Sequence, residues 1–152
     1  MKKKSLIISI IIPLFVGGIS AFLSHNQMEL YQKLNLPPLA PPETLFPIIW
    51  TFLFILMGIS SYLIYESQHP QRENALLIYA FQLFINFCWP LFFFNLHNYF
   101  LALMILIVLF ILIITMLLTF YHIHPFACYL NIPYLLWTCF AFYLNFFVFI
   151  NN

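Results

Sequence analysis

The sequence carries very little charge, and this scarcity limits what kind of protein it can be. Only 6% of its 152 residues are Asp, Glu, Lys or Arg, whereas soluble domains carry about 25%. So few charged side chains cannot cover the surface of a water-soluble globule of this length. A soluble enzyme, a nucleic-acid-binding protein and a disordered chain are therefore excluded. The length suits one domain, residues 1–152.

Cysteine is also scarce, and the sequence contains no CxxC pair. The three cysteines, Cys88, Cys128 and Cys139, are odd in number and lie in apolar surroundings. We interpret them as small buried hydrophobic residues, not as a disulfide framework or a metal site. The five histidines fall in connectors or near the ends of apolar runs. The sequence therefore predicts no metal site and no resident cofactor.

Apolar residues are abundant: they make up 64% of the chain, and the mean hydropathy is +1.00. They form five runs, each long enough to cross a bilayer as a helix that satisfies its own backbone hydrogen bonds. The runs do not alternate as barrel strands do. The first could also be a signal peptide, although it exceeds the usual core length of such peptides. We predict an all-α, five-transmembrane-helix bundle with spans at about residues 5–23, 46–65, 75–94, 99–120 and 126–150.

The connector at about residues 25–45 is long and holds two proline pairs, Pro37-Pro38 and Pro41-Pro42. Paired prolines favour polyproline II, so this loop should be semi-rigid. It is either a functional loop or a plain connector. The positive-inside rule favours an inside N-terminus and an outside C-terminus, which places this loop outside. That orientation puts Lys2, Lys3, Lys4 and Arg72 inside and Lys33 outside.

No Asp, Glu, Lys or Arg lies within the five runs. This pattern disfavours ion-coupled transport, which usually needs ionisable groups in the bilayer, and catalysis by a carboxylate pair. Three neutral amides, Gln82, Asn86 and Asn145, do lie within runs. Because an amide in hydrocarbon needs a partner, we expect them to face the bundle interior, either as helix–helix contacts or as ligand contacts.

Aromatic residues are numerous, with 20 Phe, 9 Tyr and 3 Trp. Trp89 and Trp137 lie within predicted spans, close to Pro90 and Pro133. Prolines at such positions bend helices and free backbone groups. A bent, aromatic-lined bundle with a few neutral polar groups suits a large, flat, mostly apolar ligand.

With these residues the sequence resembles the TspO/MBR family of translocator and tryptophan-rich sensory proteins. Leu39 stands where the family often has a tryptophan, and an apolar residue near Ile105 replaces an acidic one found in many members. The matching pieces include Pro13, Gly17-Gly18, Tyr31, Pro37, Pro41-Pro42, Trp50, Gly58, Ser61-Tyr62-Leu63, Gln82-Leu83, Asn86, Trp89-Pro90, Phe93-Phe94, Pro133-Tyr134-Leu135, Trp137, Phe140-Ala141 and Leu144-Asn145.

The resemblance implies a pocket under the first loop that binds porphyrins such as protoporphyrin IX. It also implies a sensory or stress-response role in a bacterial plasma membrane, and commonly a homodimer. Light-dependent porphyrin breakdown, with Trp50 and Trp137 as the photochemical residues, and transport of hydrophobic solutes such as porphyrins are the alternatives. Carried over by position, the ligand-binding residues are Tyr31, Pro41, Trp50, Asn86, Trp89, Trp137 and Ala141.

Overall fold

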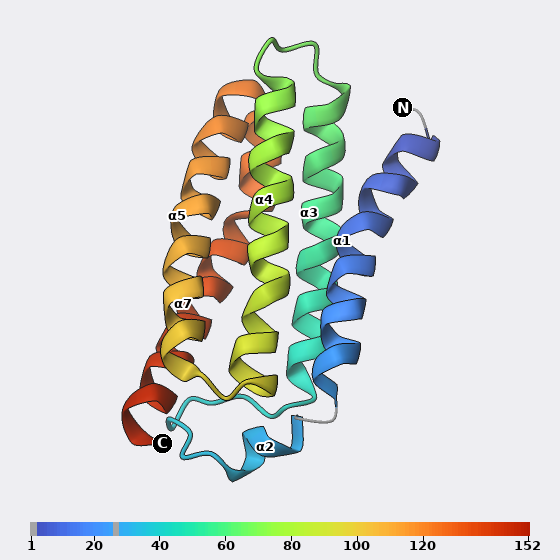
Figure 1. The fold of residues 1–152 in the computed structure, drawn as a ribbon. Coiled ribbons are helices and arrows are strands. Elements are labelled where there is room, and N and C mark those ends of the chain that lie inside the picture. The colour runs from blue at the N-terminus through green and yellow to red at the C-terminus, as the bar shows by residue number, and fades with distance from the viewer. Residues whose placement is uncertain (1–2, 26–27) are drawn as a thin grey trace.

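The computed structural model describes residues 3–25 and 28–152, so Lys2 and its predicted inside location fall outside the described part. Every regular element in that part is helical (Figure 1). Five helical stretches in it are long and apolar enough to cross a membrane, which confirms the predicted fold class. The elements are α1 (Lys3–Ser24), α2 (Met28–Lys33), α3 (Leu45–Glu66), α4 (Arg72–Pro90), the π-helical η2 (Leu91–Asn95), α5 (Tyr99–Ile123), α6 (Pro125–Leu130) and α7 (Ile132–Asn151).

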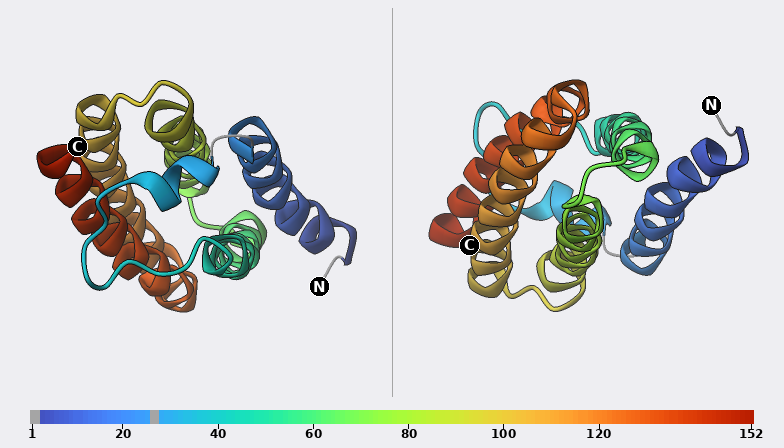
Figure 2. Two further views of the ribbon diagram at one scale, coloured as in Figure 1. Left: turned by 90° about the horizontal axis from the view of Figure 1, so that it is seen from below. Right: turned by 90° about the horizontal axis from the view of Figure 1, so that it is seen from above.

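The long helices run side by side, so the two ends of the bundle carry different connectors (Figure 1). The start of α1 and the α3–α4 connector lie at one end, while α2 and the end of α7 lie at the other. α1 packs mainly on α3, and α5 packs on α4, α6 and α7. Viewed from below, α2 and the following loop cross the open end of the bundle (Figure 2). This segment, residues 28–44, is called the lid below.

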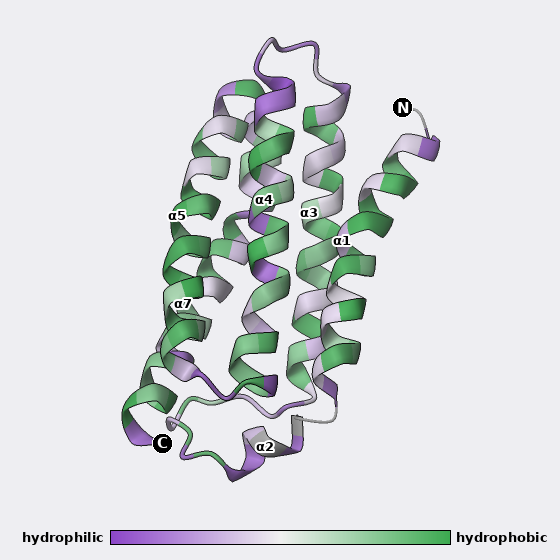
Figure 3. Cartoon of the chain, viewed as in Figure 1, coloured by the Kyte–Doolittle hydropathy of each residue, from purple (hydrophilic) through white to green (hydrophobic). Residues whose placement is uncertain are grey.

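The outer surface of the bundle is apolar along most of its length, and hydrophilic residues gather at the ends (Figure 3). Phe22 is 81% exposed and Leu77 is 67% exposed. Lipid solvates such side chains, so their exposure is expected in a membrane. Gln82, Asn86 and Asn145 are instead buried. The structure thus confirms that the three amides face the bundle interior.

The fifth predicted run is not one continuous helix, because it breaks at Asn131 between α6 and α7. Asn131 has φ −98° and ψ 0° and is completely buried. Pro133, two residues later, has no N–H to donate and its ring clashes with the carbonyl four residues earlier. The Asn131 amide nitrogen donates to the Ala127 carbonyl (2.9 Å) and to Ser60 on α3. These bonds hold the break against α3.

Two other local features were not predicted. α2 is a short helix at the start of the lid, before the proline pairs. The π-turn η2 directly follows Pro90, and the Leu96 N–H bonds to the Leu91 carbonyl at 3.0 Å. Pro90 predicted a bend in this span, and the structure has a π-turn at this place.

Glycines allow α1 to approach α3 closely. A Cβ on Gly58 would lie 2.5 Å from the Ile10 Cα, and one on Gly17 would lie 2.0 Å from the Phe54 ring. The atoms that face Gly58 are backbone atoms, so only a residue without a side chain fits there, whereas the atoms that face Gly17 belong to a side-chain ring. At Gly18 no atom lies within 4 Å of the equivalent position.

Candidate functional site

A cavity of about 190 Å³ lies between α1, α3 and α4, toward the end of the bundle that the lid covers. α3 contributes Phe46, Trp50 and Phe54 at four-residue intervals, so one face of the helix lines the cavity. α4 contributes Asn86 and Trp89 in the turn before Pro90. The complete lining is Gly17, Ser20, Ala21, Ser24, His25, Phe46, Pro47, Trp50, Phe54, Asn86, Trp89, Pro90 and Phe94.

A second cavity adjoins the first on the α7 side. Its volume is about 10 Å³, roughly the space of one water molecule. Phe46, Trp50, Trp89 and Phe94 line both cavities and so form the wall between them. The other lining residues are Tyr31, Phe93, Trp137, Ala141, Leu144 and Asn145. We call the two spaces the large and the small aromatic cavity.

The structure brings six of the seven predicted ligand-binding residues to these cavities. Trp50 and Trp89 line both, Asn86 lines the large one, and Tyr31, Trp137 and Ala141 line the small one. Pro41 lines neither cavity. Its carbonyl oxygen instead accepts a hydrogen bond from the Tyr31 hydroxyl at 3.2 Å.

Besides the packing of Leu34, Leu36 and Ala40 against the core, an aromatic contact and a set of hydrogen bonds hold the lid to the bundle. Tyr31 is only 5% exposed, and its ring meets the edge of Phe46 at a centroid distance of 5.3 Å. Burial raises the pKa of Tyr31 to about 12, and its hydroxyl donates to the Pro41 carbonyl. Asn35 is bound to the end of α7 by three hydrogen bonds, to the Asn151 carbonyl and to the Asn152 side chain, at 2.9–3.3 Å.

The three tryptophans differ in their partners although all three line the small cavity. Trp50 stacks on Phe54 at 5.4 Å, and Trp137 meets Phe46 edge-on at 5.9 Å. The Trp89 indole N–H donates to Asn145 Oδ1 at 3.0 Å. Asn145 in turn donates to the Tyr99 carbonyl at 2.9 Å, which ties α4, α5 and α7 together. Trp89 therefore already has a structural partner.

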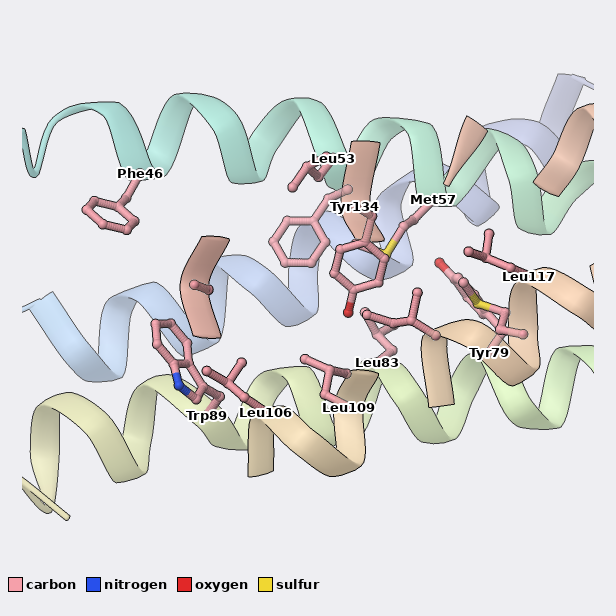
Figure 4. Packing of buried hydrophobic residues seen from close by; sticks show 14 of the residues in the cluster. Phe46, Leu53, Met57, Tyr79, Leu83, Trp89, Leu106, Leu109, Leu117 and Tyr134 are labelled. Atoms are coloured by element: carbon pink, nitrogen blue, oxygen red, sulfur yellow. The ribbon is translucent and has the colours of Figure 1, made fainter. Parts of the chain in front are cut away.

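A second polar chain crosses the bundle just beyond the large cavity. Tyr134 is 1% exposed and projects between α3 and α4 (Figure 4). Its hydroxyl accepts a hydrogen bond from Asn86 and donates one to Gln82, both at 2.8 Å. The Asn86 amide is thus held in place by α7 while it lines the cavity, an arrangement that limits its rotation.

Two buried polar groups at the cavities have no hydrogen-bond partner in the described part of the chain. They are the Ser24 hydroxyl, at the large cavity, and the Trp137 indole N–H, at the small one. Buried donors are normally satisfied, so each is available to an acceptor atom of a bound molecule. Among the described lining residues there is no Asp, Glu, Lys or Arg. The site therefore suits an apolar, aromatic ligand with a few acceptors.

The large cavity is smaller than the roughly 300–1,000 Å³ of typical ligand pockets. The lid covers this end of the bundle (Figure 2). A large flat ligand would therefore require the lid or the aromatic wall to move.

Sequence reasoning missed several residues of this site. Phe46 lies four residues before Trp50, so helical spacing could have identified it. Phe93 and Phe94 were part of the family pattern but were not among the predicted ligand-binding residues, and they lie in η2 after Pro90. The pairing of Tyr134 with Asn86 joins residues 48 positions apart and has no local signal.

Comparison with known proteins gives the same family that the sequence pattern suggested. The model of the TspO/MBR family matches residues 9–150. The chain is 33% identical to the tryptophan-rich protein TspO of Archaeoglobus fulgidus, over 100% of this chain and 99% of the relative. It is 33% identical to a tryptophan-rich sensory protein of Cereibacter sphaeroides (78% and 73% covered) and 30% identical to the human translocator protein (91% and 82% covered). The chain therefore belongs to the TspO/MBR family of integral membrane proteins.

Proposed function

We propose that this membrane protein binds tetrapyrroles of the porphyrin class, such as protoporphyrin IX, at the aromatic cavities and serves a sensory or stress-response role. The observation that carries the proposal is the meeting of Trp50, Trp89 and Trp137 at one small cavity. Flat aromatic ligands stack on such rings in offset or edge-on geometry. The Trp137 N–H, which has no partner among the described residues, offers one donor to an acceptor on the ligand.

The positions of the lid and of the cavities support this proposal. The cavities lie under a lid whose Tyr31 contacts their wall at Phe46. A porphyrin would enter by displacement of the lid, and the lid would then close over its apolar face. The Cereibacter sphaeroides relative is named a tryptophan-rich sensory protein, and this name fits a role in sensing.

Fluorescence quenching tests this proposal. All three tryptophans line the small cavity, so a bound porphyrin would lie close enough to quench their emission. Titration of the purified protein with protoporphyrin IX in darkness should give saturable quenching and a shifted porphyrin absorption band. Quenching that rises linearly, as in protein-free detergent micelles, would contradict the proposal.

A second candidate function is light-dependent porphyrin breakdown. Two observations favour it: Trp50 and Trp137 line the same small cavity, and no hydrogen bond within the described part of the chain holds the Trp137 indole. An indole beside an excited macrocycle can donate an electron to it, and dioxygen would be the oxidant that the reaction consumes. Loss of porphyrin absorbance under light, but not in darkness, separates this function from binding alone.

A different measurement distinguishes transport of porphyrins from binding and from breakdown. The human relative carries the name translocator protein. Vesicles that contain the chain would accumulate porphyrin in one direction only if the chain transports it.

The homodimer that the family resemblance implies is likewise a proposal, which the mass of the detergent-solubilised protein tests.

A further inference from the structure

A groove of about 650 Å³ runs along the side of the bundle and shares no lining residue with the aromatic cavities. α1 forms one wall and α4 the other, and two residues of α3 form the floor. Toward its N-terminus α1 leans away from the other helices (Figure 1). The lining is Ser5, Ile8, Ser9, Ile12, Phe15, Val16 and Ile19 on α1, Ser61 and Tyr65 on α3, and Leu76, Tyr79, Ala80, Leu83, Phe84 and Phe87 on α4.

The groove is amphipathic along its length. Ser5 and Ser9 lie at the end where α1 begins, and Tyr65 lies there at the end of α3. Ser61, one helical turn before Tyr65, and Tyr79 on α4 are also polar, and beyond them the lining is apolar, with Phe15, Ile19 and others. An occupant with a polar head and an apolar tail would match this order of side chains.

The length of the groove matches one leaflet of a bilayer. From Ser5 to Ile19 the α1 wall spans about 21 Å at 1.5 Å per residue. Half of a bilayer that is about 40–45 Å thick, headgroups included, has nearly the same thickness. A lipid that lies in the groove would therefore keep its head at the membrane surface.

Basic residues stand at the polar end of the groove. Lys3 and Lys4 are exposed in the first turn of α1, directly before Ser5. Arg72 lies 5.8 Å above the Tyr65 ring and donates to the Tyr65 carbonyl. The acidic residues Glu66 and Glu73 also lie at this end and offset part of this charge. The lysine pair, which directly precedes the first groove-lining residue of α1, supplies the positive charge for an anionic headgroup.

We propose that this groove is a binding site for an anionic glycerophospholipid of the leaflet on the Lys3 side. Its phosphate lies at Lys3 and Lys4, and one acyl chain lies between α1 and α4. Basic clusters at the end of a transmembrane helix attract anionic lipids in this way. The polarity gradient, the length and the charge are three separate observations that specify the same occupant.

Native mass spectrometry of the full chain in detergent tests this site with two probes, phosphatidylglycerol and phosphatidylcholine with identical acyl chains. Wild type should retain one phosphatidylglycerol, with an affinity about tenfold or more above that for phosphatidylcholine. Ala80→Trp places a large side chain in the groove from the α4 wall and should weaken phosphatidylglycerol binding at least tenfold. Leu77→Trp is the matched control, because Leu77 lies on the same helix, is 67% exposed and does not line the groove.

Two further variants make the result specific. Lys3→Gln with Lys4→Gln should remove the preference for phosphatidylglycerol and leave one phosphatidylcholine bound. Ile8→Trp fills the groove from the α1 wall, so it repeats the test if Ala80→Trp does not fold. Equal lipid retention in the groove and control variants would overturn the proposal and leave annular lipid only. Loss of a dimer in Ala80→Trp with unchanged lipid binding would instead assign the groove to a second copy of this chain.

Discussion

The three tryptophans differ more in their hydrogen-bond partners than in their positions. Trp89 is tied to Asn145, and its replacement would leave a buried amide oxygen unpaired. The Trp137 N–H has no partner in the described part, and Trp50 interacts through its ring face. We therefore expect Trp89 to contribute mainly to stability, and Trp50 and Trp137 to contribute mainly to ligand contact.

The first prediction concerns these rings. Trp50→Phe and Trp137→Phe keep most of the apolar contact area, so porphyrin affinity in darkness should fall by about tenfold or less. If light-dependent breakdown occurs, its rate should fall much further in these variants, because phenylalanine is far harder to oxidise than tryptophan. Trp89→Phe should instead lower the thermal unfolding temperature. Equal light reactivity in all three variants would rule out the assigned photochemical residues.

The second prediction concerns the glycine contact between α1 and α3. Gly58→Ala would place a Cβ 2.5 Å from the Ile10 backbone, so the helices must separate. We expect a loss of about 1–3 kcal/mol in unfolding free energy, the usual cost of overpacking. Thermal unfolding in detergent measures this loss.

Gly18→Ala is the matched control for that substitution, since outside the local backbone of α1 no atom of the described structure lies within 4 Å of its new Cβ. Alanine is favoured over glycine within helices by about 0.5–1 kcal/mol. This variant should therefore be as stable as wild type or slightly more stable. Equal destabilisation of both variants would mean that the close α1–α3 contact does not matter.

At the residue scale, the sequence was sufficient to predict that the three amides are buried, but not which residues bond to them. Gln82, Asn86 and Asn145 had to be buried because hydrocarbon offers them no hydrogen bonds. That Asn86 bonds to Tyr134, and that Trp137 lacks a partner, depends on how α4 and α7 face each other. No local pattern encodes such relations.

At the scale of elements, the lid is the part of the molecule most closely connected with the proposed function. Its contacts with the bundle include the Tyr31 ring, the Asn35 bonds to the end of α7, and the packing of Leu34, Leu36 and Ala40 against the core. The loop was expected to be semi-rigid, and these contacts show how the bundle holds it. The short helix α2 was not expected, because the prolines drew attention to the second half of the loop.

The third prediction is that Asn35→Ala loosens the lid without disturbing the bundle. The substitution removes the Asn35 side-chain bond to Asn151, and a less ordered lid would also lose its backbone bonds to Asn152. We expect hydrogen exchange in residues 34–44 to become several-fold faster and porphyrin association to speed up. Exposed Gln32, also in the lid, provides the control variant Gln32→Ala. Unchanged exchange in both variants would mean that the Asn35 bonds do not hold the lid closed.

The helices themselves show where sequence reasoning succeeds at this scale. Long apolar runs identified the five spans because a bilayer demands that length. The break at Asn131 and the π-turn after Pro90 arise from proline combined with tertiary bonds, such as that from Asn131 to Ser60. Proline indicates that a helix is disturbed, but its surroundings determine the form of the disturbance.

At the scale of the whole molecule, the two ends of the bundle differ in charge and in structure. Lys33 lies at the end of α2, whereas the α3–α4 connector lies at the opposite end (Figure 1). The general class of the protein followed from composition alone, because so little charge cannot solvate a globule. The groove could not be foreseen, since it depends on the direction in which α1 leans away from α4.

The fourth prediction concerns orientation. With the N-terminus inside, a cysteine in Lys33→Cys should react with a membrane-impermeant thiol reagent in intact cells, in a background without the native cysteines. A cysteine in Gln71→Cys, exposed just before α4, should react only after the cells are opened. The reverse pattern would place the lid and the aromatic cavities toward the cytoplasm.

The central claim, that tetrapyrroles bind at the aromatic cavities, is tested most directly by absorption titration of wild type and Ala141→Phe with protoporphyrin IX in darkness. Ala141 is 4% exposed and lines the small cavity, so a phenylalanine there would overfill that space and crowd the aromatic rings at which the ligand is proposed to bind. We predict saturable binding to wild type, at least tenfold weaker binding to Ala141→Phe, and wild-type binding to Ala80→Trp, which fills only the groove. Wild-type affinity in a folded Ala141→Phe protein would contradict the account.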